Sequence, residues 1–481
     1  MKVTETLGPA SRVWAILMIA VAGIVLVWGL SAAENALFAI AGATGTIVLL
    51  APAGNLRRMT VVFLISLSVV VPILVLPWSV LTYFRLDDAM FGMLCLWWLK
   101  DRNGRHPGTV SRLVRDRMLF PFLLFNGVVL LSMLLVVMTA GTQTMMLGNL
   151  AWYALRHFQA MAVFLMAYSL RTDRGFLLLA GRLIVYASSI LTVVGILQYV
   201  NLIPWYDYLG FATMFHLGRE NGIVSLLGFN HAHYGAYVTV ATLIGLELMD
   251  EDRPRWQWFA LVPLNLFGLI LSLSRASWAA FLVGLLFLQR PGRRLVLVAR
   301  AALVSIAAAI VMVQGGFGED VGARLGYGGT DEAASAMDSA TWRIDNNRLA
   351  VDFVSSRPEV LIVGVGYMNW RYEVNRFAEG RSSGGHNNFL TVLLELGVVG
   401  MVAFLWFWGG LSFRIGRLHG RDSPGARAVR AGIVGLVVSC ASQETLYPVW
   451  SMESLLTFVA LIGGLWLGAG SEEGSVNPPP D

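Results

Sequence analysis

The feature that most constrains this chain is the alternation of long apolar segments with short connections, every second of which is basic. An apolar segment of about 20 residues is long enough to cross a bilayer as a helix. Fourteen segments fit this pattern, and the fourth and tenth are the shortest: 13–33, 35–53, 59–82, 84–99, 118–140, 152–170, 175–200, 222–249, 256–274, 276–289, 295–314, 387–411, 428–446 and 451–469. The alternation predicts an all-α polytopic membrane protein.

The basic connections predict how the chain is oriented. Arginines follow the second, fourth, sixth, eighth, tenth and twelfth segments, as at Arg57, Arg171, Arg253 and Arg417. Cytoplasmic loops carry an excess of Lys and Arg, so these connections and both termini are predicted to lie inside. One miscounted segment would break the alternation, so the charges also support the count.

Four regions follow from this topology. Transmembrane helices 1–11 are predicted in 1–314, one large periplasmic loop in 315–386, the C-terminal transmembrane helices in 387–469, and a disordered cytoplasmic tail in 470–481. Within the loop, 342–353 has apolar side chains among charges and predicts an amphipathic helix in the plane of the membrane interface. Residues 360–365 form an apolar run that ends at a Gly-Val-Gly sequence.

The composition excludes several classes of protein. Hydrophobic residues make up 56% of the chain and charged residues 14%, whereas soluble domains carry about 25% charged residues. The net charge of +5 is spread over short loops rather than clustered on one domain, which argues against a nucleic-acid partner. The two cysteines lie in apolar segments, and the chain has no HExxH, DxD-like or CxxC arrangement. We therefore expect neither a metal site nor a cofactor.

Three cationic or ionisable side chains lie at predicted outer span ends. Arg219 precedes the eighth segment, Arg275 lies in the corner LSLSRASW between the ninth and tenth, and His386 begins the twelfth. An arginine at a span end can simply reach the lipid headgroups, and this interpretation stays open. Two guanidinium groups in one outer pocket would suit a diphosphate, because arginine binds phosphate oxygens through paired hydrogen bonds.

The stretch GGHNNFLTVLLELGVVGM, which contains His386, predicts the start of a helix. Asn is a good helix N-cap, so the helix should begin within a residue or two of His386. At 3.6 residues per turn, Gly397 and Gly400 share a face with His386 and predict a close helix–helix contact there. A histidine at the water end of such a contact can exchange a proton near neutral pH. His216, in the same loop as Arg219, is a further candidate for binding.

Two other features have a structural interpretation. Asp87 and Asp88 form the nearest carboxylate pair, and their place at the start of the fourth segment favours a helix cap. His157 lies within a span, where a packed core residue is more frequent than a ligand. We expect neither feature to belong to the site.

Taken in order, these motifs resemble bacterial O-antigen ligases and related polysaccharide polymerases. His386–Asn387, nine residues, Gly397, two residues and Gly400 is similar to a motif of that family, and LSLSRASW resembles its "SR" span end. RENGIVSLLGFN resembles the family's Arg-Gly-Phe-Asn stretch. The segment from Trp342 and Arg343 to Gly366 resembles its large periplasmic loop, which reads Arg, helix, Pro and then GxG. Members have about twelve spans, so we expect 12–14.

This resemblance implies a GT-C-like glycosyltransferase of the bacterial inner membrane with a site that faces the periplasm. The donor would be a glycan on undecaprenyl pyrophosphate, and the acceptor a hydroxyl of a glycan or lipid, as in lipopolysaccharide or exopolysaccharide synthesis. Arg219 and Arg275 would bind the pyrophosphate, and His386 would be the general base of a metal-independent, inverting transfer. Arg343, Asn387 and His216 would be further substrate contacts.

A multi-span transporter or a flippase of lipid-linked glycans is the alternative. Transporters place key polar groups near the bilayer midplane, often in broken helices. In this sequence the middles of the spans are poor in charge, and polar side chains gather at the outer ends. That distribution favours an enzyme.

Overall fold

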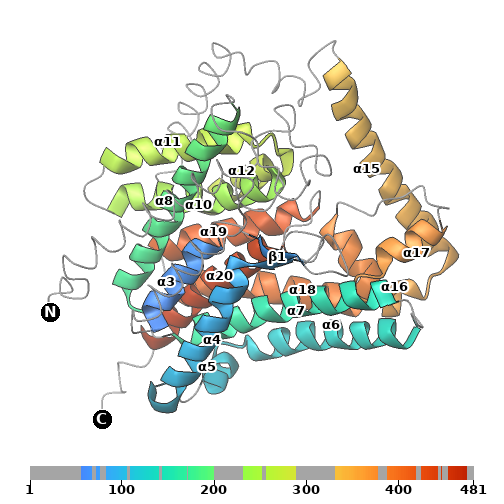
Figure 1. The fold of residues 1–481 in the computed structure, drawn as a ribbon, viewed down its shortest axis with the longest axis horizontal. Coiled ribbons are helices and arrows are strands. Elements are labelled where there is room, and N and C mark those ends of the chain that lie inside the picture. The colour runs from blue at the N-terminus through green and yellow to red at the C-terminus, as the bar shows by residue number, and fades with distance from the viewer. Residues whose placement is uncertain are drawn as a thin grey trace.

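A computed structural model describes residues 56–67, 72–75, 83–105, 109–139, 144–170, 172–199, 231–251, 256–288, 331–377, 387–418, 424–441, 446 and 453–473. These ranges contain fifteen helices and one two-stranded hairpin, so the prediction of an all-α polytopic protein is confirmed apart from that hairpin (Figure 1). The elements are α3 (Leu56–Ser66), β1 (Pro72–Val75), β2 (Tyr83–Arg85), α4 (Leu86–Arg105), α5 (Thr109–Arg115), α6 (Leu119–Thr139), α7 (Thr144–Ser169), α8 (Arg174–Tyr199), α10 (His231–Glu251), α11 (Trp256–Leu271), α12 (Arg275–Leu288), α15 (Asp331–Ser356), α16 (Val360–Val363), α17 (Trp370–Phe377), α18 (Asn388–Leu418), α19 (Pro424–Ser439) and α20 (Glu453–Glu473).

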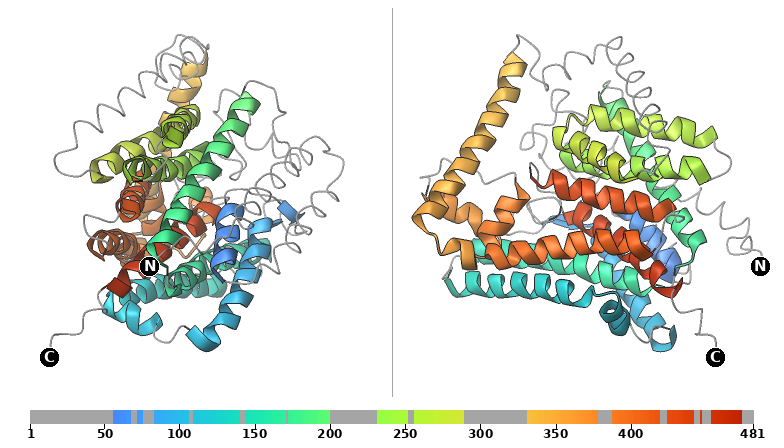
Figure 2. Two further views of the ribbon diagram at one scale, coloured as in Figure 1. Left: turned by 90° about the vertical axis from the view of Figure 1, so that its left-hand side faces the viewer. Right: turned by 180° about the vertical axis from the view of Figure 1, so that it is seen from behind.

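Three of the described helices are long and apolar enough to cross a membrane: Leu119–Met138 in α6, Arg174–Leu197 in α8 and Asn388–Arg417 in α18. Helices α6 and α18 pack against each other, and the view from behind in Figure 2 shows them running in nearly the same direction. Helix α6 leaves large apolar side chains exposed along its length, as at Leu123, Leu131 and Met138. That surface fits contact with lipid, because the helix is apolar all round.

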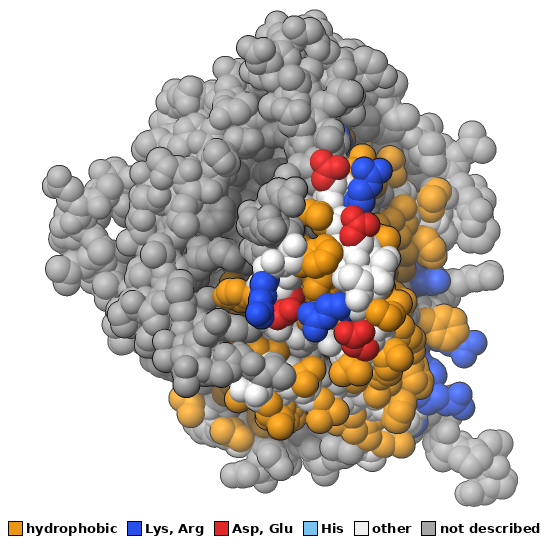
Figure 3. Space-filling view, turned by 90° about the vertical axis from the view of Figure 1, so that its right-hand side faces the viewer, with side chains coloured by type: hydrophobic (Ala, Val, Ile, Leu, Met, Phe, Trp, Pro, Cys, Tyr) orange, Lys and Arg blue, Asp and Glu red, His pale blue; other side chains and the backbone are white. Residues whose placement is uncertain are grey.

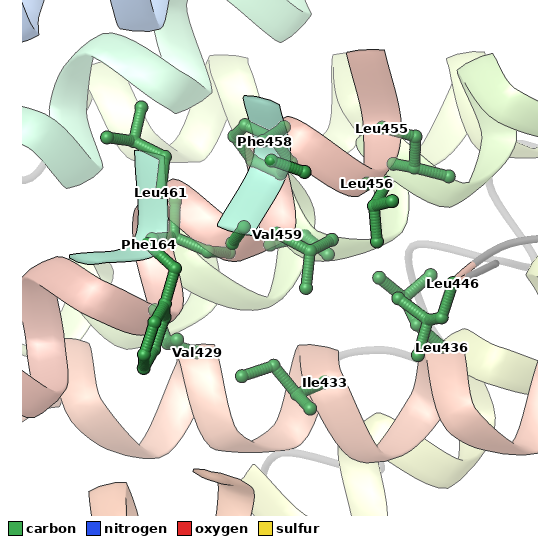
Figure 4. Packing of buried hydrophobic residues seen from close by; sticks show 14 of the residues in the cluster. Phe164, Val429, Ile433, Leu436, Leu446, Leu455, Leu456, Phe458, Val459 and Leu461 are labelled. Atoms are coloured by element: carbon green, nitrogen blue, oxygen red, sulfur yellow. The ribbon is translucent and has the colours of Figure 1, made fainter. Parts of the chain in front are cut away.

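The core of the bundle lies where α20 packs against α7 and α19. Phe164 of α7, Ile433 of α19 and Phe458 of α20 are buried members of this hydrophobic cluster (Figure 4). Glycines on α20 allow this close approach: a Cβ on Gly464 would lie 2.5 Å from the carbonyl oxygen of Phe164. Gly468, one turn further, meets the carbonyl of Tyr168 in the same way. The close glycine contact expected of membrane helices is therefore found on α20.

Helices α10, α11 and α12 form a second group that packs on α19 (Figure 1). Glu247, near the end of α10, joins the two groups through the first turn of α19. Its carboxylate accepts hydrogen bonds from Arg427 Nε and from the backbone amide of Ala428, each over 2.7 Å. A carboxylate at a helix N-terminus also stabilises the free amides and the helix dipole there.

The structure corrects two predicted boundaries. The span predicted over 59–82 is wrong: α3 ends at Ser66, and Pro72–Val75 pairs with Tyr83–Arg85 as an antiparallel hairpin. Prolines at 72 and 77 explain the difference, because proline lacks the amide that a continuous helix needs. Helix α20 continues to Glu473 beyond the predicted end at 469. Helix α10 begins at His231, and residues 222–230 of its predicted span lie outside the described residues. The predicted spans 13–33, 35–53 and 295–314 lie outside the described residues, so the count of fourteen stays a prediction.

The 315–386 loop contains α15, α16 and α17, which we call the loop module. Phe353 of α15, Val360 of α16 and Trp370 of α17 form a small buried cluster with Leu394 of α18. The helix predicted over 342–353 lies inside α15, which runs across the direction of α6 and α18 (Figures 1 and 2). The module therefore has a small core of its own, which is joined to one membrane helix.

Candidate functional site

Arg275 is the first residue of α12, and a serine-rich corner holds it in place. Ser274 is the helix N-cap: its Oγ accepts from the amide of Ser277 over 3.3 Å and lies 2.8 Å from Ser277 Oγ. Ser272 Oγ donates to the carbonyl of Leu269 over 2.6 Å. The serines are buried, whereas Arg275 is exposed. The corner therefore presents one guanidinium to its surroundings from a fixed backbone.

The same corner is bonded to the start of α10. Ser277 Oγ donates to the carbonyl of Ala232 over 3.2 Å, and Thr239 Oγ1 donates to the carbonyl of Ser277 over 3.1 Å. Gly235 allows this approach, because a Cβ there would lie 2.6 Å from Ser277 Oγ. Arg275 thus lies at the end of the bundle where α10 begins.

Helix α18 begins at Asn388, which confirms the prediction that a helix starts within two residues of His386. Asn387 Oδ1 accepts from the amide of Leu390 over 3.1 Å, which is the N-cap bond. The amide of Asn388 donates to the carbonyl of Cys440 over 2.8 Å and so fixes the start of α18 to the end of α19. A substrate contact by Asn387 stays a prediction.

Helix packing places Arg275 and the start of α18 at the same end of the bundle. Helices α12 and α19 pack against each other, and Gly435 of α19 lies against the carbonyl of Ala280 of α12. The chain runs five residues back from Ala280 to Arg275 and five residues forward from Gly435 to Cys440. The Cys440 carbonyl is hydrogen-bonded to Asn388, so Arg275 and the start of α18 lie at the same end of these helices.

The remaining predicted site residues are only partly described. Arg219, His216 and His386 lie outside the described residues. Arg343 lies in α15, but its side chain is also outside the described part of the chain. The meeting of Arg219, Arg275 and His386 in one pocket therefore stays a prediction.

Helix α18 is broken at Gly397, whose φ and ψ angles are 69° and −172°. Carbonyl groups next to this break bond to the turn Gly364–Val365–Gly366, which we call the GVG turn. The amide of Val365 donates to the carbonyl of Leu394 over 2.7 Å, and the amide of Gly366 donates to that of Glu395 over 3.0 Å. The predicted glycine face shared by His386, Gly397 and Gly400 is wrong for this reason: at Gly397 the backbone leaves the helix.

The close backbone contact between α18 and the segment of α16 and the GVG turn requires glycine in both segments. A Cβ on Gly397 would collide with the carbonyl of Ile362, and one on Gly364 would collide with the carbonyl of Glu395. Both glycines have positive φ, at 69° and 78°, which other residues rarely adopt. We infer that these glycines serve contact between the loop and α18 rather than contact between two long helices.

Glu395 brings the loop module, α18 and α6 together. Its side chain is buried, and Oε2 accepts from the amide of Met368 over 2.9 Å, just after the GVG turn. Its carbonyl also accepts from Ser132 Oγ of α6 over 3.2 Å. The sequence interpretation passed over Glu395, although a carboxylate in an otherwise apolar span is a signal of a structural or functional role.

Arg156 was also missed, and it forms a buried ion pair. Its guanidinium contacts both carboxylate oxygens of Asp88, with Nη2 2.8 Å from Oδ2, and Nη1 lies 3.0 Å from Gln159 Oε1. The ring of Trp152 lies 4.2 Å from its Cζ. Asp88 is therefore half of an ion pair between α4 and α7, in addition to lying in the first turn of α4. The signal in the sequence was an arginine inside a predicted span.

His157 is a packed core residue, as predicted. Its ring is buried, lies 5.3 Å from the ring of Phe125 and places Nε2 3.2 Å from Asn126 Oδ1. Among the described residues, no group of three His, Cys, Asp or Glu side chains is placed to hold a metal ion.

Comparison with known proteins adds one finding. Residues 260–405 match the family model described as O-antigen ligase, and no curated protein matches the chain. The matched segment is under a third of the chain, and it includes the corner at Arg275, the GVG turn, the start of α18 and its break at Gly397. Over this segment the chain is therefore similar to the O-antigen ligase family.

Proposed function

We propose that this protein transfers a glycan from undecaprenyl pyrophosphate to a hydroxyl group of a glycan or lipid acceptor. It would act on the periplasmic face of the bacterial inner membrane, as an O-antigen ligase or a polysaccharide polymerase, with a GT-C-like arrangement. The observation that carries the proposal is the position of Arg275 and the start of α18 at one end of the bundle, inside the segment that matches the O-antigen ligase family.

Arg275 and Arg219 bind the pyrophosphate in this proposal. Arg275 suits that role because it is exposed on a corner whose serines are buried and hydrogen-bonded. Its guanidinium can bind two phosphate oxygens at once and offset the charge that grows on the leaving group. A corner fixed by bonds to α10 keeps the guanidinium in place without reorganisation during the reaction.

His386 is the general base in this proposal. The acceptor oxygen attacks the anomeric carbon of the donor sugar, and the hydroxyl proton passes to the His386 ring. The bond between the anomeric carbon and the pyrophosphate oxygen breaks, and its electron pair leaves with undecaprenyl pyrophosphate. Attack from the opposite side inverts the anomeric centre, and the step needs no metal. Arg343, Asn387 and His216 would contribute further contacts to the substrates.

The direct test is transfer by the purified protein. It would be given a defined undecaprenyl-pyrophosphate-linked oligosaccharide and candidate acceptors, and the products would be identified by mass. We expect free undecaprenyl pyrophosphate and an acceptor that has gained the oligosaccharide with inverted configuration. An unchanged donor with every glycan and lipid acceptor, from protein that binds the donor, would contradict the proposal.

The alternative is a transporter or flippase of lipid-linked glycans. The buried Arg156–Asp88 pair is one observation in its favour, because charges within spans can mark transport pathways. Reconstitution in liposomes separates the two functions. Movement of a labelled donor across the bilayer without chemical change would favour transport, whereas transfer without movement would favour the enzyme.

A further inference from the structure

The short helix α16 leaves two large apolar side chains uncovered. Ile362 is 70% exposed and Val363 is 60% exposed, whereas Val360 points into the small core of the loop module. Helix α16 packs directly on α18, where the carbonyl of Ile362 meets Gly397. The neighbouring residues of α18 are exposed and apolar as well: Val398, Val399 and Val402 are about half exposed. Exposed apolar side chains of α16 and of α18 therefore lie on either side of this backbone contact.

The sequence of α18 shows at what level these side chains lie. Glu395 is followed by eighteen uncharged residues, from Leu396 to Phe413, before Arg414. At 1.5 Å per residue this stretch is about 27 Å long, close to the roughly 30 Å of a bilayer's hydrocarbon core. Gly397 is the second residue of the stretch. Counted from Glu395, the charged residue within the predicted span 387–411, a helix in contact with Gly397 lies at the edge of the hydrocarbon, beside the exposed valines of α18.

Charged residues stand immediately before α16 in the chain. Arg357, just before it, has Nη1 3.0 Å from Glu373 Oε2 and Nε 3.5 Å from Glu359 Oε1. Figure 3 shows charged side chains gathered on this face of the molecule, with hydrophobic side chains covering the area below them. A change from ion pairs to exposed Ile and Val within a few residues is typical of a segment at a membrane–water boundary.

We propose that α16 is seated in the membrane, with Ile362 and Val363 in contact with lipid acyl chains beside Val398 and Val402 of α18. The occupant of this surface is the bilayer itself. Moving the side chains of Ile362 and Val363 from water into lipid is favourable, because apolar surface is removed from water. The edge of the hydrocarbon lies at the depth of these two residues. The loop module is then held at a fixed depth by lipid as well as by its bonds to Leu394 and Glu395.

Quenching of a fluorescent label tests this placement. Cys95 and Cys440 would be replaced by serine, and single cysteines introduced as Ile362→Cys, Val402→Cys and Ser355→Cys. Val402 is the lipid-facing control on α18, and Ser355 is an exposed polar control on the loop module. The labelled protein would be placed in phosphatidylcholine vesicles with either a doxyl-labelled lipid or aqueous iodide as quencher.

We expect the label at position 362 to be quenched like the label at position 402. The doxyl lipid should quench it strongly, and iodide should quench it severalfold less than it quenches the label at position 355. Strong quenching by iodide and weak quenching by the doxyl lipid at position 362, as expected at position 355, would overturn the proposal. So would a label at this position that is shielded from both quenchers. A disulfide between two copies of the unlabelled Ile362→Cys variant would then show that another copy covers the surface. No glycan substrate is present, so failure here is distinct from failure of the proposed transferase activity.

Discussion

The backbone amide of Gly366 donates to the carbonyl oxygen of Glu395 over 3.0 Å, and this bond joins the GVG turn to the break in α18. A broken membrane helix leaves carbonyl groups that must find new donors, because lipid supplies none. The GVG turn supplies two such donors, at Val365 and Gly366. The position of the loop module is thereby coupled to the first segment of α18, which begins beside His386.

Replacement of Gly397 by alanine should destabilise the protein. The added Cβ would collide with the Ile362 carbonyl, and the positive φ alone costs about 1–3 kcal/mol for a residue other than glycine. Gly409 is the matched control on the same helix, because it has open space around it and ordinary helical surroundings. Gly409→Ala should raise stability by about 0.5–1 kcal/mol. Thermal unfolding in detergent should show a lower midpoint for Gly397→Ala and a higher midpoint for Gly409→Ala. Equal shifts of the two midpoints would contradict the close contact between Gly397 and Ile362.

Loss of one partner from the buried Arg156–Asp88 pair should be severe. Asp88→Ala leaves a buried guanidinium without its carboxylate, which typically costs about 3–5 kcal/mol. Glu359→Ala, in an ion pair with Arg357 that is about half exposed, should cost about 0–1 kcal/mol. The midpoints of thermal unfolding give the comparison. A small loss for Asp88→Ala would mean that water or another group compensates Arg156.

The sequence predicted features that depend on local patterns, and it missed those that depend on contacts between distant segments. The start of α18 followed from Asn387 and the apolar run after it, and the corner before α12 followed from the break between two apolar segments. The break at Gly397 did not follow, because a Gly-x-x-Gly spacing in an apolar run also fits a straight helix in a close contact. The carbonyl groups beside the break are bonded by the GVG turn, some thirty residues earlier, and by Ser132 of α6, and both partners are distant in the sequence.

The ion pair of Arg156 shows the same limit. Its partner Asp88 lies 68 residues earlier, in another helix. An acidic residue in the first turn of a helix is explained locally by the helix dipole, so nothing in the sequence required a distant partner. The core contact between α20 and α7 also joins segments that are remote in the chain.

Cysteine labelling should place the 315–386 loop and the arginine-rich connections on opposite sides of the membrane. Cysteines introduced at Ser335 and Ser423, with Cys95 and Cys440 replaced, would be treated with a membrane-impermeant reagent in spheroplasts and in inverted vesicles. We expect Ser335 to react from outside and Ser423 from inside, because basic loops stay in the cytoplasm. Reaction from the same side would exclude the predicted topology.

Arg275 should be sensitive to the shape of its side chain as well as to its charge. Arg275→Ala should weaken donor binding by roughly tenfold to a hundredfold, as for loss of a hydrogen bond between charged groups. Arg275→Lys should keep only part of the donor affinity, because an ammonium group cannot bind two phosphate oxygens as the planar guanidinium group does. Arg348→Ala, an exposed arginine on α15, is the control and should bind normally. Normal donor binding by folded Arg275→Ala would assign Arg275 to the lipid headgroups.

The measurement that most directly tests the account is transfer by the His386→Asn variant. Asparagine can still stand before the helix, so the fold and the binding of the undecaprenyl-pyrophosphate donor should persist. Loss of the general base should lower glycan transfer by about a hundredfold or more. His106→Asn, in a predicted cytoplasmic connection, is the control and should transfer normally. Donor binding without transfer by His386→Asn is the predicted result, and near-normal transfer by that variant would contradict the central claim.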